Sequence, residues 1–294
     1  MIHSDGKSLK KNTRYVRVII VNTLFVFATT ILTACFPLFA AAFDSESDGY
    51  LALSGEEFVS YMSGRMGFAR QPGLDGTLND FRRDLGLPKN NQTIRLEMYA
   101  RPLEHHMLRI YGTIPEAYTG KRILKRELIF QNQTLPIGTD VRSDMHITHF
   151  GFGYDLDLLL GNRYQGGANA DIRFLRYFVK LEALNSGSEH VMSLDEVVPC
   201  LGGHFKSLTR PTLSLWPAGF AIGICGRLTY GINPNYLNLY ELKLGINGTV
   251  VAPFGGAIDL KVGYQVEGWS QINVAGRDLE FKREGVFISL AAAF

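Results

Sequence analysis

The sequence predicts an all-β fold, namely a transmembrane, antiparallel, up-and-down β-barrel of about ten strands, with eight or twelve strands as alternatives. Apolar and polar side chains alternate with a period of two residues, as in a strand whose two faces meet different surroundings. After residue 42, no apolar stretch reaches the roughly 18 residues that a transmembrane helix needs. The mean hydropathy of +0.02 fits a wall with one apolar and one polar face.

The first predicted element is a cleavable signal peptide over residues 1–42. Basic residues between positions 7 and 17 precede an apolar stretch over 18–34. The small-residue cleavage pattern consists of Ala40 and Ala42, directly before Phe43. The sequence therefore predicts export across a membrane.

Two alternatives to cleavage at this site remain. The apolar stretch over 18–34 is long enough to act as a permanent transmembrane anchor. The segment 32–35 resembles the lipobox of bacterial lipoproteins, in which Cys35 would become the lipidated N-terminus. The residues directly after Cys35 are apolar, where a lipoprotein usually has a polar tether, so cleavage at the alanines is favoured.

The net charge of +2 comes from the same N-terminal segment. Residues 1–42 hold five basic residues and one acidic residue, and the remainder holds 25 basic and 27 acidic residues. The sequence therefore gives no support for a nucleic-acid partner. Two cysteines remain after residue 42, and we expect separate thiols, with Cys200 in a loop and Cys225 in a strand. The Cys and His spacing indicates no metal site, and no cofactor is expected.

The predicted barrel domain covers residues 43–294. Its ten candidate strands start near residues 57, 92, 106, 140, 167, 210, 220, 237, 257 and 284. Two local signals compete with this assignment. A capping-box pattern at 54–57 could begin a helix instead of the first strand. Asn247-Gly248 is a hairpin signal inside a predicted strand.

The connections are predicted to alternate in length. Short turns are expected at 102–105, 159–162, 216–219 and 253–256, a tight connection at 233–235, and long polar loops at 71–91, 117–140, 185–208 and 270–283. In a membrane barrel the short turns face the periplasm and the long loops face the exterior. Within the loops we expect short helical turns at 80–85 and from Ser193 to Pro199, and a hairpin around 128–130.

The apolar face is predicted to point outward into lipid. The polar face mixes glycine, asparagine, threonine and single charges of both signs, and Tyr240 and Tyr264 lie on the apolar face near strand ends, where interfacial aromatic girdles occur. The opposite arrangement, an apolar core as in a soluble sandwich or a ligand-binding barrel, is the alternative.

The last strand carries a recognisable pattern. Apolar residues occupy every second position up to an aromatic end, at Val286, Ile288, Leu290, Ala292 and Phe294. This pattern resembles the C-terminal assembly signature of bacterial outer-membrane β-barrel proteins. The resemblance implies location in the outer membrane of a Gram-negative bacterium, contact with outer-membrane lipids and lipopolysaccharide, and recognition of the last strand by the barrel-assembly machinery.

Charged side chains at predicted inward positions form the main candidate site. The candidates are Arg95, Glu97, Arg109, Asp144, His146, Asp171, Arg173, Arg227, Glu241, Lys243, Asp259, Lys261 and Glu267. They could line a conduit or pair with one another as a plug. The interior of a barrel of about eight to ten strands is nearly filled by side chains, which favours the plug.

A possible catalytic cluster is formed by Asp144, His146 and Thr148, which alternate along one strand face. It is similar to outer-membrane phospholipases and lipid A deacylases, which carry a histidine and a serine on the outer face of a strand. Here threonine stands in place of serine, and the alternation predicts that the cluster points into the lumen. We therefore expect a non-catalytic protein with a structural, surface-interaction or narrow transport role, binding any extracellular ligand at its long loops. A lipid hydrolase using His146 and a selective small-solute channel are the alternatives.

Overall fold

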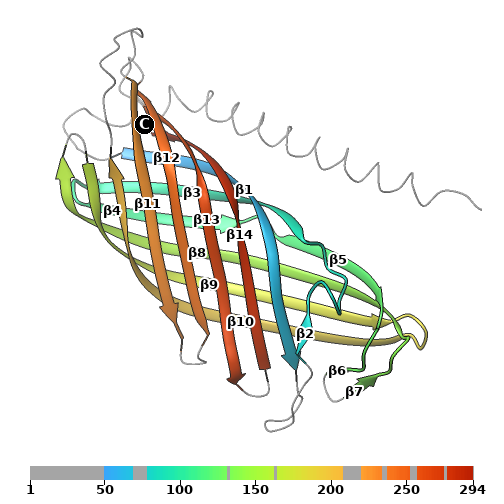
Figure 1. Cartoon of the computed structure of the whole chain (residues 1–294). Helices are drawn as coiled ribbons and strands as arrows, with labels where there is room; N and C mark the ends of the chain where they lie inside the picture. Colours follow the sequence, from blue (N-terminus) through green and yellow to red (C-terminus); the bar gives the residue numbers. More distant parts are fainter. Residues whose placement is uncertain are drawn as a thin grey trace, which may run out of the picture. The chain divides into compact units, whose positions relative to one another are not determined.

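The computed structural model describes residues 50–68, 78–130, 133–161, 164–207, 220–233, 237–251, 257–274 and 277–293. These residues form one antiparallel sheet, which closes because the last strand pairs with the first over Ala52–Phe68 and Arg277–Ala293 (Figure 1). The predicted signal peptide, its cleavage residues Ala40, Ala42 and Phe43, and the terminal Phe294 lie outside the described residues. Within the described ranges, no helix is long and apolar enough to cross a membrane.

The wall of the barrel has ten positions, nine filled by single strands and one by two short strands in succession. They are β1 (Tyr50–Phe68), β3 (Asn90–Leu103), β4 (His106–Thr113) followed by β5 (Glu116–Ile123), β8 (Asp140–Gly161), β9 (Tyr164–Ala183), β10 (Ser188–Ser207), β11 (Phe220–Ile232), β12 (Asn238–Val251), β13 (Ala257–Val274) and β14 (Arg277–Ala293). Both β4 and β5 pair with β8, and the break between them contains Pro115, which has no N–H for the ladder. The predicted ten-stranded antiparallel barrel is confirmed.

The sixth wall strand differs from the prediction. It is β10, which lies in the segment 185–208, where the sequence predicts a long loop containing Cys200 and a short helix after Ser193. Inward positions of β10 hold apolar residues such as Leu194, and outward positions hold charged ones such as Asp195. This order is the reverse of the pattern expected in a membrane, which explains why the segment resembles a polar loop. The strand predicted to start at 210 falls outside the described residues.

Other local predictions can be compared with the described backbone. The prediction of a long loop at 270–283 is wrong, because β13 continues to Val274 and β14 starts at Arg277. The competing signals at 54–57 and 247–248 lie inside β1 and β12, so they start neither a helix nor a hairpin. The hairpin around 128–130 is confirmed as β6 (Leu128–Phe130) paired with β7 (Gln133–Leu135).

The loop between β1 and β3 contains β2 (Asn79–Asp80) and one tight turn. The carbonyl of Asp80 accepts hydrogen bonds from the N–H groups of Asp84 and Leu85, so a hydrogen-bonded turn, and not a helix, lies where the sequence predicts a short helical turn at 80–85. Gly86 ends this turn with a φ of 67°, a left-handed conformation that favours glycine. The backbone of this turn lies against Gly120 of β5, where a side chain would have no room.

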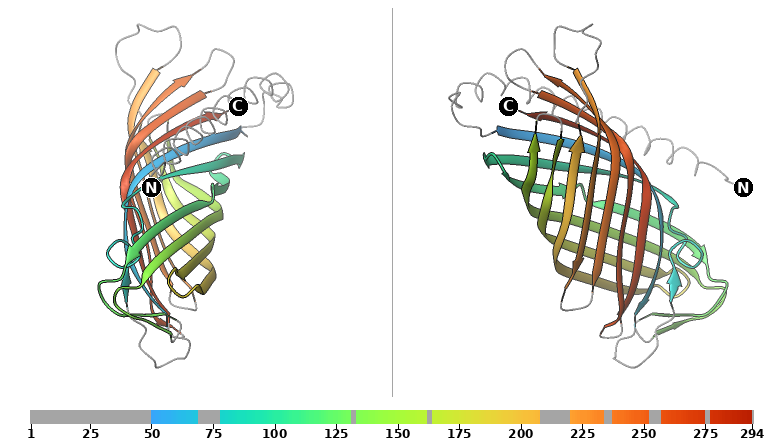
Figure 2. Two further views of the ribbon diagram at one scale, coloured as in Figure 1. Left: turned by 90° about the vertical axis from the view of Figure 1, so that its right-hand side faces the viewer. Right: turned by 60° about the vertical axis from the view of Figure 1, so that its left-hand side comes forward.

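The two ends of the barrel differ, and Figure 2 shows both. At the turn end, where β1 begins and β14 ends, short connections join β3 to β4 and β8 to β9. At the loop end lie the β1–β3 loop and the β5–β8 segment that carries β6 and β7. Turns predicted at 216–219 and 253–256 lie wholly or mainly outside the described residues.

The outer surface changes polarity along the strands. On β8 the outward residues near the turn end are Phe150, Phe152 and Tyr154, all more than a third exposed, whereas those near the loop end are Arg142 and His146. The same change recurs on neighbouring strands. We call the part with an apolar outer surface the membrane half, and the remainder the loop-end half. An exposed apolar belt around a closed wall is the surface that a bilayer requires.

The interior changes in the opposite sense. In the membrane half, inward positions of β8 hold Gly151, Gly153 and Asp155, whereas in the loop-end half they hold the fully buried Met145 and Ile147. The loop-end half is filled by an apolar core to which β1, β5, β8, β9, β10 and β14 all contribute. The loops complete this core, through Phe81, Leu85, Leu87, Leu124, Leu128, Phe130 and Leu135.

Candidate functional site

The candidate site is a network of ion pairs that crosses the lumen of the membrane half. Nine cationic and nine anionic side chains of the described strands project into it, so their formal charges cancel. The cations are Arg95, Arg101, Arg109, Arg173, Lys206, Arg227, Lys243, Lys261 and Arg283, and the anions are Glu56, Glu97, Glu116, Asp155, Asp157, Asp171, Glu241, Asp259 and Glu267.

Arg109 on β4 is the centre of the part nearer the turn end. Its guanidinium lies 3.0 Å from Glu97, 3.1 Å from Asp155 and 2.5 Å from Asp171, and its side chain is almost completely buried. Asp155 also pairs with Arg227 of β11 at 2.6 Å. Side chains from four strands, β3, β4, β8 and β9, therefore meet at one guanidinium.

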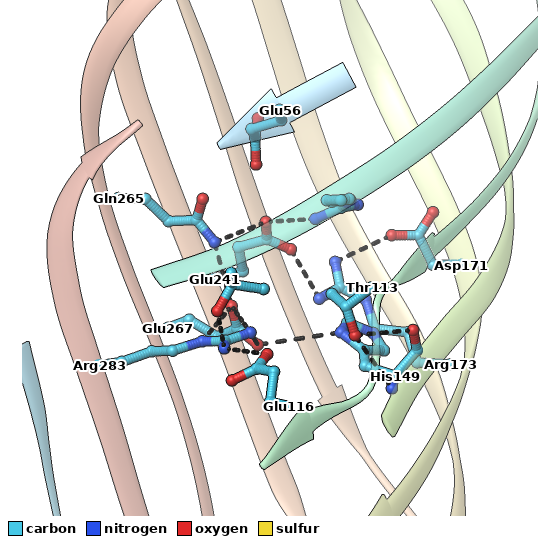
Figure 3. A network of polar contacts seen from close by, with 12 residues as sticks. Glu56, Thr113, Glu116, His149, Asp171, Arg173, Glu241, Gln265, Glu267 and Arg283 are labelled. Carbon is cyan, nitrogen blue, oxygen red and sulfur yellow. Dashed lines mark hydrogen bonds and ion pairs between the residues drawn. The ribbon is translucent and has the colours of Figure 1, made fainter. Parts of the chain in front are cut away.

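Arg173 on β9 continues the network across the lumen. Its Nη1 lies 2.6 Å from Oε2 of Glu241 on β12, and its Nη2 donates to Asp171 at 3.1 Å. Glu241 also forms ion pairs with Arg95 of β3 at 3.0 Å and with Lys243 at 3.4 Å. Figure 3 shows Asp171 and Arg173, which share β9, on one side of the lumen and Glu241 of β12 reaching toward them.

Arg283 on β14 closes the network at the boundary with the loop-end half. It donates to Glu116 at 2.6 Å, to Glu267 at 3.1 Å and to the hydroxyl of Thr93 at 3.1 Å. His149 lies beside this group, with Nδ1 at 4.0 Å from Glu267 (Figure 3). All of these side chains are buried.

Inward glycines on β8 make room for the network. A Cβ at Gly153 would meet the guanidinium of Arg109 at 2.6 Å and the carboxylate of Asp171, and a Cβ at Gly151 would meet the ring of Tyr111 at 2.6 Å. The Gly151-Phe152-Gly153 pattern therefore combines two inward positions without side chains with an outward aromatic residue.

The energetics of the network follow from burial. Removing a charge from water costs several kcal/mol, and the attraction of a partner offsets this only when both charges are present and well placed. The described residues satisfy that condition for Arg109, Arg173 and Arg283, each of which has two or three carboxylate partners. The arrangement is therefore a plug of mutually dependent charges.

Most of the predicted lumen residues face inward in the structure. They are Arg95, Glu97, Arg109, Asp171, Arg173, Arg227, Glu241, Lys243, Asp259, Lys261 and Glu267. The inward placement of Asp144 and His146 is wrong. Both lie in the loop-end half of β8, where Met145 and Ile147 occupy the inward positions.

Several network members are absent from the sequence-based candidates. Glu116 follows the break at Pro115, which interrupts the alternation. Arg283 lies in a segment that the sequence assigns to a loop. Asp155 and Asp157 lie at odd-numbered positions of β8, between outward residues at even-numbered positions such as Tyr154. Extending the alternation past residue 153 therefore identifies both carboxylates as inward-facing.

The candidate catalytic cluster has little internal contact. Asp144 pairs with Arg142 at 3.3 Å, and the ring of His146 lies 5.7 Å from that of Phe178 on the outer surface. Within the described residues, no hydrogen bond links Asp144, His146 and Thr148. The described part of the chain also contains no group of three His, Cys, Asp or Glu side chains that could hold a metal ion.

The cysteines and the last strand complete the predicted positions. Cys200 and Cys225 are free thiols on β10 and β11, so the expected separate thiols are confirmed, but Cys200 is buried in a strand and does not lie in a loop. On β14, Val286, Ile288 and Leu290 point outward and are at least a third exposed, and Ala292 is largely covered.

No protein-family model and no curated protein matches this sequence. Among solved structures, the outer-membrane protease OmpT of Escherichia coli matches with a TM-score of 0.41 and 10% identity, over 86% of this chain and 98% of that chain. The transport unit of the autotransporter AIDA-I of Escherichia coli gives a TM-score of 0.39 and 9% identity, over 85% and 90%. The outer-membrane protein OprG of Pseudomonas aeruginosa matches with a TM-score of 0.30 and 8% identity, over 84% of this chain and 97% of that chain.

These similarities are too weak to support any argument about activity, and the barrel's own geometry carries the assignment. The wall is closed, its outer belt is apolar and its lumen is polar. The protein is an integral β-barrel of the bacterial outer membrane. In such barrels the short turns face the periplasm, and we infer that the turn end is periplasmic and the loop end extracellular.

Proposed function

We propose that this outer-membrane barrel is a non-catalytic, sealed barrel that presents a folded β-structure at the cell surface, where it serves a structural or surface-interaction role. The observation that carries the proposal is the inversion of polarity along the strands. The membrane half anchors the chain, and the loop-end half is built like a soluble β-protein, with apolar residues inside and charged residues outside.

The lengths of the strands support an extension beyond the bilayer. A tilted strand crosses a membrane with about 9–11 residues. The strands β8, β9 and β10 contain 22, 20 and 20 residues. About ten residues of each are therefore available outside the membrane, which corresponds to roughly 30 Å of strand. The outward side chains of this part include the exposed ion pair of Arg176 and Asp195.

The interior supports a sealed barrel. A conducting lumen needs a continuous water-filled path, whereas here Arg95, Arg109 and Arg173 bind carboxylates that project into the lumen from non-neighbouring strands. Above them, the apolar core excludes water from the loop-end half. A narrow transport role would require both the ion-pair network and the apolar core to open.

Two measurements test this proposal. Purified protein in planar bilayers should give no discrete conductance steps. A protease site inserted in the β9–β10 turn, at Gly187 with its positive φ of 68°, should be cleaved on intact cells. Discrete steps that shift in selectivity when Arg95 or Lys261 is neutralised would instead establish the selective channel.

The lipid hydrolase remains the alternative for one reason: His146 points outward, close to the apolar belt that begins at Phe150. A lipid could reach this position without entering the lumen. The substitution His146→Ala should leave lipid release by the purified protein at background level, as in the unsubstituted chain. Release that depends on His146 would overturn the non-catalytic proposal.

A further inference from the structure

A cavity of about 140 Å³ lies in the lumen between the central ion pairs and the periplasmic end. Its wall includes Glu56, Arg95, Lys206, Cys225, Lys243 and Lys261, and we call this space the vestibule. A water molecule takes about 30 Å³ in the liquid, so the vestibule is large enough for a small hydrated solute.

The vestibule is cationic although the whole network is balanced. Six cations line it, namely Arg95, Arg109, Lys206, Arg227, Lys243 and Lys261, whereas only two carboxylates do, namely Glu56 and Glu97. The other carboxylates that pair with these cations, including Asp155, Asp171, Glu241 and Asp259, do not line the cavity. The cations therefore face the space and their carboxylate partners stand behind them.

Two buried polar groups on the wall have hydrogen-bonding capacity left over. Arg95 is 6% exposed, and its Nη1 donates to Glu241, but its Nε has no partner. The side chain of His204 is 9% exposed, and its Nε2 is bonded to Asp157 at 2.7 Å, but its Nδ1 has no partner. Such groups are costly when buried without a partner.

Lys261 differs from the neighbouring lysines. Lys206 pairs with Asp259 at 2.7 Å, and Lys243 pairs with Glu56 at 2.5 Å. Among the described residues, no carboxylate lies within ion-pair distance of Lys261. Cys225 lines the vestibule together with these three lysines, and the sheet register places it opposite Lys206. Cys225 therefore reports on the field inside the vestibule.

We propose that the vestibule binds a small soluble oxyanion of the phosphate or carboxylate class, held by the ammonium of Lys261 and the guanidinium of Arg95, both of which line the space. The anion neutralises the excess positive charge of the cations that face the space. Binding needs no passage through the central plug, so the site is compatible with a sealed barrel and adds a function to it.

The test measures the rate at which Cys225 reacts with two methanethiosulfonates of opposite charge. The thiolate attacks the reagent sulfur, a mixed disulfide forms, and methanesulfinate leaves. In full-length protein in a lipid-free maltoside detergent, the anionic sulfonatoethyl reagent should label Cys225 about tenfold faster than the cationic trimethylammonioethyl reagent. Mass spectrometry of the Cys225 peptide separates this reaction from any at Cys200.

Competition and substitution identify the site. Millimolar inorganic phosphate should slow the anionic reagent more than chloride of equal ionic strength does, because chloride reports screening alone. Lys261→Gln should reduce the preference for the anionic reagent, and Lys282→Gln, a matched control on the outer surface, should not. Lys282 pairs with Glu284 at 2.6 Å and is 44% exposed.

Equal rates for the two reagents, or equal effects of phosphate and chloride, would overturn the proposal. So would protection by an anionic phospholipid added to the micelles without protection by phosphate, because the ligand would then be a lipid headgroup. The slower migration of boiled protein on a gel checks that each variant is folded. If Lys261→Gln does not fold, the measurements on the unsubstituted chain still decide the question.

Discussion

The membrane half and the loop-end half are built from the same strands with opposite polarity. On β9, Arg173 points inward and is fully buried among carboxylates, whereas Arg176, three residues further and on the other face, pairs with Asp195 on the exposed surface. Leu175 and Leu181 point inward, and Ile172 points outward. The comparison shows that strand geometry fixes the alternation and that the surroundings decide which face is apolar.

The two halves also differ in how their interiors are stabilised. The loop-end half buries apolar side chains, and each contributes according to the apolar area that it removes from water. The membrane half buries charges, and each depends on partners from other strands. Substitutions should therefore have larger and less additive effects in the lumen of the membrane half.

The largest expected effect comes from Arg173→Met. It leaves Asp171 and Glu241 without one buried partner, and we expect a loss of about 3–5 kcal/mol in the free energy of unfolding. The matched substitution Arg176→Met on the same strand should leave the denaturation midpoint unchanged, because that pair is exposed. Urea titration in detergent, followed by gel mobility, measures both. Equal effects would contradict the contrast between the two faces.

The second effect concerns the apolar core of the loop-end half. Leu181→Ala removes a fully buried side chain, and we expect a loss of about 2–5 kcal/mol. The control Val191→Ala, on an outward position that is 42% exposed, should change the free energy of unfolding by less than about 0.5 kcal/mol. A small effect of Leu181→Ala would mean that this half does not form an independent core.

The third effect tests the position of the apolar belt. Val262→Arg places a charge near the middle of the outward row of β13, and we expect a loss of about 2–4 kcal/mol in lipid vesicles. Ser193→Arg, an outward position in the loop-end half, should cost little, because that surface lies in water. Reversible folding into vesicles gives both values. A similar cost at both positions would place the membrane boundary elsewhere.

The smallest effect is the pH dependence of the β1–β3 loop. Burial alone raises the pKa of Asp84, but hydrogen bonds from Arg126 and Arg83 outweigh it, so the pKa lies below the ordinary value of 3.8. A lowered pKa in the folded state stabilises the loop above pH 3.8, and this contribution is lost as the pH falls below that value.

Hydrogen exchange of residues 78–87 measures this contribution. Protection should decrease as the pH is lowered below 3.8, after correction for the intrinsic exchange rate, while the loop-end core stays protected. Asp84→Asn should reduce protection at neutral pH and remove its pH dependence. A pH dependence that survives in Asp84→Asn would assign the effect to another group.

The sequence by itself determined the fold class and, apart from the segment 270–283, the two faces of the last four strands. From Phe220 onward, alternating residues such as Leu242 and Glu241 fixed which face meets lipid, because both faces keep one polarity over most of these strands. The period of two residues was therefore enough to place Glu241, Lys243 and Glu267 in the lumen. A local signal was sufficient there.

Only the tertiary structure decided where that polarity inverts. Asp144 and His146 follow the same alternation as the lumen residues, yet they lie in the loop-end half, where the inside is apolar. For the same reason β10 resembled a loop. Glu116, a partner of Arg283, lies on β5, which β14 approaches only when the barrel closes through the pairing of β1 with β14. The position of a residue along the barrel axis and its contacts across the lumen exist only in the closed wall. A two-residue alternation in the sequence carries no information about either.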